Sequence, residues 1–199
     1  MASTTRSLFQ VRTLAEGALC IALAAVLNML SVGAPQGGRI SLVMVPLVIF
    51  ALRHGMAEGA IVGGLFGMVD LLIEPGGIMF PPQVVLDYPL AFGLVGLVAG
   101  AFAVWWHDAD ARSRVSGAWV AVLATVCAGV ARFLAHFVSG VVFFGSFAPK
   151  GTPVWIYSLV YNGFYMVPAT LATAAAVAIL MPALQRALPT RAPVREAVS

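Results

Sequence analysis

Residues 129–140, Gly-Val-Ala-Arg-Phe-Leu-Ala-His-Phe-Val-Ser-Gly, form the stretch that decides the predicted fold. The stretch is apolar enough to lie in a bilayer, yet it carries Arg132 and His136, four positions apart and therefore on one face of a helix. Ionisable side chains inside a membrane helix usually face a bundle interior or a water-filled cavity. We therefore expect a membrane helix with a polar inner face. An alternative is that Arg132 snorkels, or pairs with an acid only to hold helices together.

The composition of the whole chain is that of an integral membrane protein. Of its 199 residues, 61% are hydrophobic and 10% are charged, and the mean hydropathy is +0.97, whereas a soluble domain has about 25% charged residues. A single lysine, with no interleaving of basic and aromatic residues, argues against nucleic-acid binding. Cys20 and Cys127 lie in apolar runs without metal-ligand spacing, so neither a metal nor another cofactor is expected.

Six apolar segments predict an all-α integral membrane bundle of six transmembrane helices. They lie at about 14–31, 40–52, 56–73, 83–106, 118–144 and 154–184. The second is short for a full crossing, so we expect it to be tilted or partly sunk in the protein. Trp105 and Trp106 are expected to be interfacial anchors. The expected domains are a cytoplasmic lead, a membrane substrate-binding domain and a cytoplasmic tail, at 1–12, 13–185 and 186–199.

The distribution of arginines predicts the orientation of the bundle. With six crossings, both termini lie on the side that collects Arg6, Arg12, Arg53, Arg112, Arg114, Arg186, Arg191 and Arg195. The opposite side collects only Arg39 and Lys150. The positive-inside rule then predicts a multi-pass plasma-membrane protein with both termini in the cytoplasm.

Polar and aromatic residues gather at one depth in the outer half of the predicted bundle. They come from the fourth, fifth and sixth helices and are Asp87, Tyr88, His136, Phe144, Tyr157, Tyr161, Asn162 and Tyr165. A carboxylate, an imidazole, phenols and an amide together suit a cationic, aromatic small molecule that forms hydrogen bonds. An interfacial belt is the alternative for the tyrosines. For Asp70 and Glu74, a structural or loop role is at least as consistent with the sequence as a ligand role.

The sequence signatures of several enzyme classes are absent from the chain. There is no H-E-x-x-H, no G-x-S-x-G and no P-loop. Ser139 lies near His136, but this pair has no orienting acid in the sequence. At 199 residues without an obvious repeat, the chain is better suited to be a subunit of a transporter than a self-sufficient secondary transporter.

Five segments together resemble a known family. They are VPLVIFALRHG (45–55), AIVGGL (60–65), LDYPLA (86–91), HFVSGVVF (136–143) and YSLVYNG (157–163). Over about residues 14–180 the chain resembles the substrate-binding S-component of energy-coupling factor (ECF) vitamin transporters, specifically the thiamine transporter ThiT (YuaJ) family. The resemblance implies that the chain binds thiamine from outside. Uptake would be driven by partners, an ECF transmembrane coupling subunit and two ATPase subunits, so the chain itself would not be an enzyme.

The resemblance also implies roles for individual residues. Asp87 occupies the position at which the family has a glutamate that faces the cationic ligand. Arg132 occupies a position at which the family has a lysine. The implied substrate-binding set is Asp87, Tyr88, His136, Phe144, Tyr157 and Asn162. Ala18 and Ala22 match the family's small-residue contact with the coupling partner. This strip of small residues also fits internal packing within the bundle.

Three positions depart from the family's pocket pattern. Gly67 and Phe144 each stand where the family has a tryptophan, and Ser41 replaces a glutamate. Trp155 is a candidate to compensate for the lost aromatic stacking. The departures leave a thiamine precursor or another vitamin as an alternative ligand. The alternative from a different class is a small intramembrane enzyme that uses His136 and Asp87.

Overall fold

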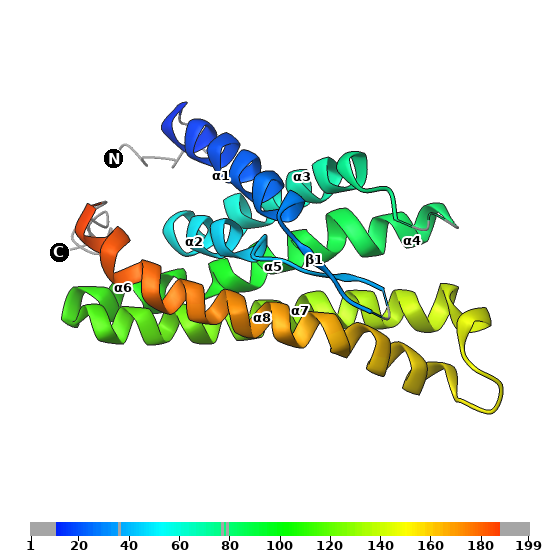
Figure 1. Cartoon of the computed structure of the whole chain (residues 1–199). Coiled ribbons are helices and arrows are strands. Elements are labelled where there is room, and N and C mark those ends of the chain that lie inside the picture. The colour runs from blue at the N-terminus through cyan, green and yellow to red at the C-terminus, as the bar shows by residue number, and fades with distance from the viewer. Residues whose placement is uncertain (1–10, 36, 77, 79, 188–199) are drawn as a thin grey trace, which may run out of the picture.

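The computed structural model of the chain describes residues 11–35, 37–76, 78 and 80–187 (Figure 1). The predicted lead at 1–12 and tail at 186–199 lie almost wholly outside these residues. The all-α bundle that we expected from the sequence is confirmed. Its long helices are α1 (Val11–Met29), α3 (Met56–Ile73), α7 (Arg114–Phe143) and α8 (Val154–Ala187).

The remaining elements are shorter and lie at the centre and at both ends of the bundle (Figure 1). The strands β1 (Val32–Gly33) and β2 (Arg39–Ile40) form an antiparallel hairpin. The central helix is α2 (Met44–His54), and a short 3₁₀ turn, η2 (Gly145–Phe147), follows α7. The fourth predicted segment is a succession of α4 (Pro81–Val85), a π-helical turn η1 (Leu86–Leu90), α5 (Ala91–Ala101) and α6 (Ala103–Arg112).

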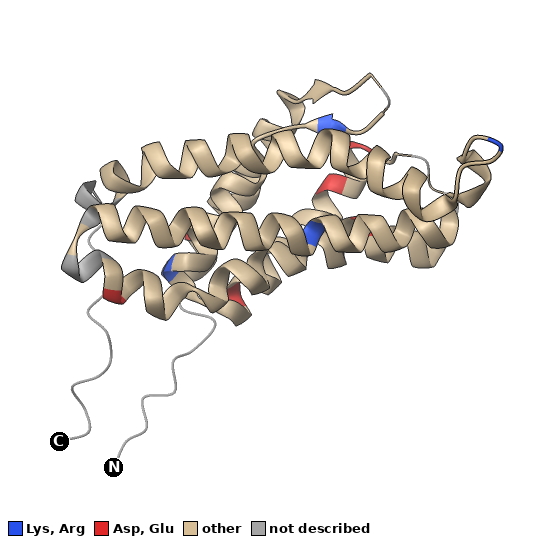
Figure 2. Cartoon of the chain, turned by 90° about the horizontal axis from the view of Figure 1, so that it is seen from below, with Lys and Arg blue, Asp and Glu red and all other residues tan. Residues whose placement is uncertain are grey.

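Five stretches of the described chain are long and apolar enough to cross a membrane: Val11–Met29, Met56–Ile73, Pro81–Ala101, Val115–Phe143 and Val154–Leu184. Figure 2 shows that the helices run for long stretches without a charged residue. The remaining predicted crossing, the second segment, corresponds to α2, which has 11 residues and is therefore about 16 Å long, short of a hydrocarbon core of about 30 Å. The sequence-based expectation of a short second helix is confirmed.

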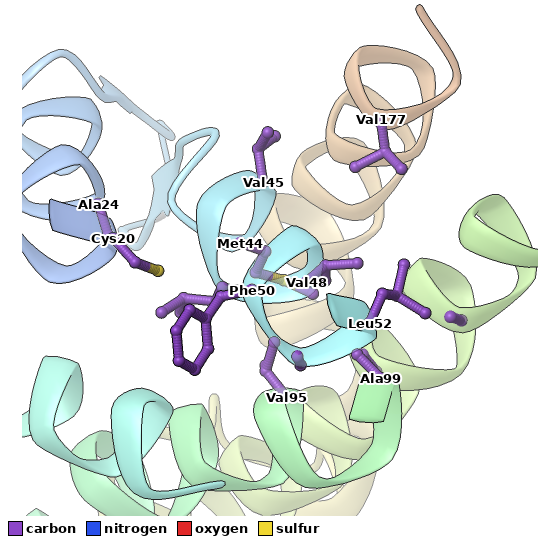
Figure 3. Packing of buried hydrophobic residues seen from close by; sticks show 14 of the residues in the cluster. Cys20, Ala24, Met44, Val45, Val48, Phe50, Leu52, Val95, Ala99 and Val177 are labelled. Carbon is purple, nitrogen blue, oxygen red and sulfur yellow. The ribbon is translucent and has the colours of Figure 1, made fainter. Parts of the chain in front are cut away.

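The core of the protein is built around α2. Eight of its 11 residues are buried, and Val48, Ala51 and Leu52 are fully enclosed. Figure 3 shows its side chains packed between residues of α1, α5 and α8, among them Cys20, Val95 and Val177. This helix is apolar on all sides because protein surrounds it, which explains how a short helix is accommodated within the bundle.

One expectation for the region after residue 100 is wrong, and the fourth predicted helical segment is longer than expected. Trp106 is not an interfacial anchor, because its side chain is only 1% exposed and belongs to the core, whereas Trp105 is 63% exposed. Consecutive residues on a helix point about 100° apart, so one tryptophan faces out and the next faces in. The polar stretch after Trp106 is also helical up to Arg112. Only Ser113 separates α6 from α7, and its extended backbone and side chain cap the N-terminus of α7.

Glycines allow α3 and α5 to approach each other closely. A Cβ atom at Gly63 would overlap the carbonyl oxygen of Phe92, and one at Gly96 would overlap that of Gly59. At Gly67 a Cβ would lie 2.6 Å from the carbonyl carbon of Tyr88. Small residues at such positions let helix backbones come together in membranes. This contact also holds the π-helical turn η1 against α3.

We predict that Gly67→Ala destabilises the fold. The new Cβ would meet backbone atoms of Tyr88 and Pro89, which cannot rotate away. Overpacking of this kind typically costs about 1–3 kcal/mol. The matched control is Gly64→Ala on the same helix, where the nearest atom lies 3.7 Å away. Thermal unfolding in detergent should show a lower midpoint for Gly67→Ala only. Equal midpoints for the two variants would contradict the assigned helix contact.

Candidate functional site

A cavity of about 760 Å³ lies in the half of the bundle that contains the hairpin, the α3–α4 connection and η2. These segments lie at the end opposite to the start of α1 (Figure 1). The volume is in the usual range for small-molecule sites, about 300–1,000 Å³. All six predicted substrate-binding residues line it: Asp87, Tyr88, His136, Phe144, Tyr157 and Asn162. The cavity therefore brings together residues of η1, α7 and α8 and the C-cap of α7.

Asp87 is held by two neighbours at the wall of the cavity. Its Oδ2 accepts a hydrogen bond of 2.9 Å from Nε2 of Gln83, and its Oδ1 lies 3.3 Å from Nδ1 of His136. The side chains of Asp87 and His136 are only 13% and 15% exposed. Asp87 belongs to η1, and π-helical turns are frequent at functional sites because they change the direction in which side chains point. The result is a carboxylate fixed in direction and largely shielded from solvent.

Arg132, His136 and Ser139 present one polar face of α7 to the cavity. Their spacing of four and three residues places them on the same side of the helix, and all three line the cavity. This confirms the polar inner face expected from the sequence. Arg132 does not snorkel, since its guanidinium lies 4.4 Å from the centroid of the Phe92 ring. Within the described part of the chain, it forms no ion pair within 4.0 Å.

The same α7 face carries buried polar atoms without partners. They are Nε of Arg132, Nε2 of His136 and Oγ of Ser139, none of which has a hydrogen-bond partner among the described residues. Buried polar atoms are nearly always hydrogen-bonded in folded proteins, so each such atom calls for an explanation. All three residues line the cavity, so a bound molecule is one source of the missing partners.

The tyrosines of α8 form a second wall. Tyr157, Tyr161 and Tyr165 follow one another at ring separations of 5.8 and 6.0 Å, and all three line the cavity. This position in the cavity favours a binding role for the tyrosines over the alternative of an interfacial belt. The turn of the hairpin lies against them. A Cβ at Gly37 would overlap the hydroxyl of Tyr161, and a Cβ at Gly38 would overlap the ring of Tyr165. Both glycines have positive φ angles, 101° and 75°.

Two of the predicted ligand residues also bind other parts of the protein. Nδ2 of Asn162 donates to the backbone oxygen of Ser158 at 2.9 Å, and its Oδ1 accepts a 2.9 Å hydrogen bond from the hydroxyl of Tyr165. The Tyr88 hydroxyl donates to the backbone oxygen of Glu74 at 3.0 Å and accepts from the amide of Gly76 at 2.9 Å. These contacts shape the wall of the cavity, because they orient the Asn162 amide and fix the α3–α4 connection.

The charges around the cavity leave a net negative balance. Its lining contains the carboxylates Asp70, Glu74 and Asp87, and the guanidinium groups of Arg39 and Arg132. With His136 neutral, three negative groups face two positive groups, so the lining carries one net negative charge. Arg39 forms an ion pair with Glu74. An aromatic cavity with one excess carboxylate is suited to a monovalent cation.

The profile of a family described as thiamine transporter protein (Thia_YuaJ) matches residues 14–188. The chain belongs to the thiamine transporter family. It is 39% identical to thiamine transporter ThiT of Bacillus subtilis over 183 residues, which cover 90% of this chain and 95% of that protein. It is 35% identical to ThiT of Lacticaseibacillus paracasei over 141 residues, covering 69% of this chain and 70% of that one.

A solved structure of a thiamine transporter agrees with this assignment. ThiT from Listeria monocytogenes superposes with a TM-score of 0.78 at 28% identity, covering 88% of this chain and 96% of that chain. Membership of the thiamine transporter family identifies a multi-pass membrane transporter. The alternative of an intramembrane enzyme that uses His136 and Asp87 is therefore set aside.

The three departures from the pocket pattern of the thiamine transporter family have different structural meanings. Phe144 and Ser41 line the cavity. Gly67 does not, since it packs against the backbone of Tyr88, where no tryptophan fits. Treating Gly67 as a lost stacking residue is therefore wrong. Trp155 does not compensate, because it is 55% exposed and lies outside the cavity lining.

Sequence reasoning missed several residues of the cavity. Gln83 precedes Asp87 by four positions, and that spacing was a usable signal within a helix. Asn28 is an isolated polar residue in an apolar helix, and it donates a 2.7 Å hydrogen bond to Oδ1 of Asp70. Phe147 lies on η2 and packs against Phe144 with 6.0 Å between ring centroids. No local pattern distinguishes Phe147 from an ordinary loop aromatic.

Proposed function

We propose that the chain is the substrate-binding S-component of an ECF transporter and binds thiamine from outside. The observation that carries the proposal is an aromatic cavity with one net negative charge, in which Asp87 is oriented by His136 and Gln83. Thiamine has a permanently charged thiazolium ring and a hydrogen-bonding aminopyrimidine. A shielded carboxylate attracts the cation, and the side chains of Arg132, His136 and Ser139, which line the cavity, supply further hydrogen bonds.

Thiamine binding is tested with the purified wild-type protein. Native mass spectrometry of protein isolated from cells should detect co-purified thiamine, and isothermal titration should give one thiamine per chain without turnover. Titration with the isolated aminopyrimidine and thiazole halves provides the comparison, because each half lacks part of the proposed contacts. If a precursor saturated the protein while thiamine did not, the proposed ligand would be wrong.

The proposed partners are an ECF transmembrane coupling subunit, which would dock on α1, and two ATPase subunits. Ala18 and Ala22 are both exposed on the outer face of α1, whereas Gly17, Cys20 and Ala24 point into the bundle. The alternative that the Ala18 and Ala22 strip packs inside the bundle is therefore wrong. An exposed strip of small residues lets a second helix approach the backbone closely, which supports a helix of another subunit as its partner.

The proposed orientation places both termini in the cytoplasm and the cavity mouth outside. We predict that a membrane-impermeant maleimide labels Lys150→Cys in intact cells, in a background that lacks Cys20 and Cys127. Lys150 is exposed in the connection between α7 and α8. The control is Ala57→Cys, which is exposed at the start of α3 at the other end of the bundle. It should react only after the membrane is opened. The reverse pattern would overturn the orientation.

A further inference from the structure

Asp70 is a second carboxylate in the cavity, and its surroundings differ from those of Asp87 and Glu74. It lies on α3 near the C-terminal end of the helix and lines the cavity. Its Oδ1 accepts a 2.7 Å hydrogen bond from Nδ2 of Asn28, whose side chain is buried in α1. Oδ2 has no hydrogen-bond partner among the residues that the structure describes. One oxygen is therefore fixed by the protein, and the other is available.

The other carboxylates of the cavity already have partners. Glu74 forms an ion pair with Arg39, and Asp87 contacts His136 and Gln83. Asp70 receives its direct hydrogen bond from a neutral amide. The positive group that acts on it most strongly is Arg132, yet the described residues include no ion pair within 4.0 Å between the two. The charge of Asp70 is only partly balanced by the protein.

An independent observation also points to a ligand in this part of the cavity. Within the described part of the chain, Nε of Arg132 is buried and has no hydrogen-bond partner. The same is true of Oγ of Ser139, a residue that is only 1% exposed. Both residues line the same cavity as Asp70. The free carboxylate oxygen offers a bound molecule an acceptor, and the missing partners of Arg132 and Ser139 fit a ligand that binds beside these side chains.

We infer that Asp70 is a ligand-facing carboxylate that makes the cavity prefer a cation to a neutral molecule of the same shape. This inference rests on the proposed function and deepens it. Asn28 fixes the direction of the carboxylate, and the free Oδ2 faces the cationic ligand. The excess negative charge of the cavity then comes from two aspartates, Asp70 of α3 and Asp87 of η1, not from Asp87 alone. Arg132 limits this charge, so the cavity accommodates one positive charge and not two.

The alternative is a purely structural role, in which Asp70 only ties α1 to α3 through Asn28. Asp70→Asn distinguishes the two, because its side-chain oxygen still accepts the hydrogen bond from Asn28 while the negative charge is lost. A structural role predicts that cationic and neutral ligands are affected alike. A ligand-facing role predicts a loss confined to the cation, because only the cation interacts with the removed charge.

The experiment is isothermal titration of wild type and Asp70→Asn with thiamine and with an analogue in which a neutral thiophene replaces the thiazolium ring. For Asp70→Asn, thiamine affinity is expected to fall by at least about tenfold, and analogue affinity by less than about threefold. Asp108→Asn, which removes the same charge on α6, should leave both affinities unchanged. Thermal unfolding shows that each variant is folded.

The outcomes separate this inference from the proposed function. If wild type binds thiamine and Asp70→Asn binds it equally well, Asp70 does not face the ligand. If both ligands lose the same affinity, the role of Asp70 is structural. If wild type does not bind thiamine, the proposed function fails and this inference with it. A loss confined to the cation establishes Asp70 as a determinant of specificity.

Discussion

Asp87→Asn is expected to weaken thiamine binding by at least about thirtyfold. The substitution preserves the shape of the side chain and leaves an oxygen that Gln83 can donate to, but it removes the charge that we propose as the partner of the cationic ring. Because the Asp87 side chain is only 13% exposed, water screens this interaction poorly. Removing one partner of a buried charged contact typically costs about 2–5 kcal/mol. Isothermal titration measures the loss directly.

Comparison with neutral contacts makes the Asp87 result specific. His136→Ala and Asn162→Ala remove stacking or neutral hydrogen bonds and should each cost about 1–3 kcal/mol. Part of the Asn162 effect should appear as lower stability, since its amide also binds Ser158 and Tyr165. Unchanged thiamine affinity in a folded Asp87→Asn protein would exclude Asp87 as the partner of the cation.

A different view of Asp87 makes it the ion-pair partner of Arg132. Under that view Asp87→Asn would destabilise the protein, and Arg132→Met would partly restore its stability. Among the described residues, however, Asp87 contacts His136, and Arg132 lies over the Phe92 ring. We therefore expect no rescue in the double variant. Restored stability in that variant would show that the two charges are coupled.

The sequence predicted those features that depend on the helical period alone. Arg132 and His136 share a face because they are four residues apart, and the structure places both in the cavity. Asp87 and His136 are predicted at one depth, since Asp87 lies near the outer start of the fourth helix and His136 lies in the outer half of the fifth. The structure adds that they are in contact, at 3.3 Å. Depth along the membrane can be read from sequence position, but rotation of one helix against another cannot.

The features that the sequence did not predict depend on packing between distant segments. The contact of Gly67 with the Tyr88 backbone requires α3 and η1 to lie together at a particular register, which no local pattern specifies. The hydrogen bond between Asn28 and Asp70 joins residues 42 positions apart. The π-helical turn that carries Asp87 also escaped sequence analysis, because Leu-Asp-Tyr-Pro-Leu fits an ordinary helix start equally well.

Ala18→Trp and Ala22→Trp are expected to prevent assembly with the coupling subunit and to leave thiamine binding intact. Both alanines are exposed on one face of α1, where an indole ring would hold a partner helix away from the backbone. The opposite face of α1 is anchored to the bundle. Oε2 of Glu16 lies 2.7 Å from Nε2 of His54 on α2. The next residue, Gly17, packs against Val62 and Phe50.

Leu23→Trp is the matched control for these variants. Leu23 is also exposed on α1, at 49%, but it lies about 100° around the helix from Ala22. A tryptophan there adds the same bulk on a face turned away from the strip. Co-purification of the coupling and ATPase subunits with a tagged chain should fall by at least about tenfold for the two alanine variants and remain unchanged for Leu23→Trp.

Thiamine titration of the same variants separates docking from folding. The strip begins in the half of α1 remote from the cavity, and Asn28, the α1 residue that lines the cavity, lies six positions beyond Ala22. A bulky side chain on the outer face of α1 therefore cannot contact a ligand in the cavity. Variants that bind thiamine but no longer co-purify with partners would establish the strip as the docking surface. Normal assembly of both alanine variants, or parallel loss of thiamine and partners, would place the coupling contact elsewhere on the protein.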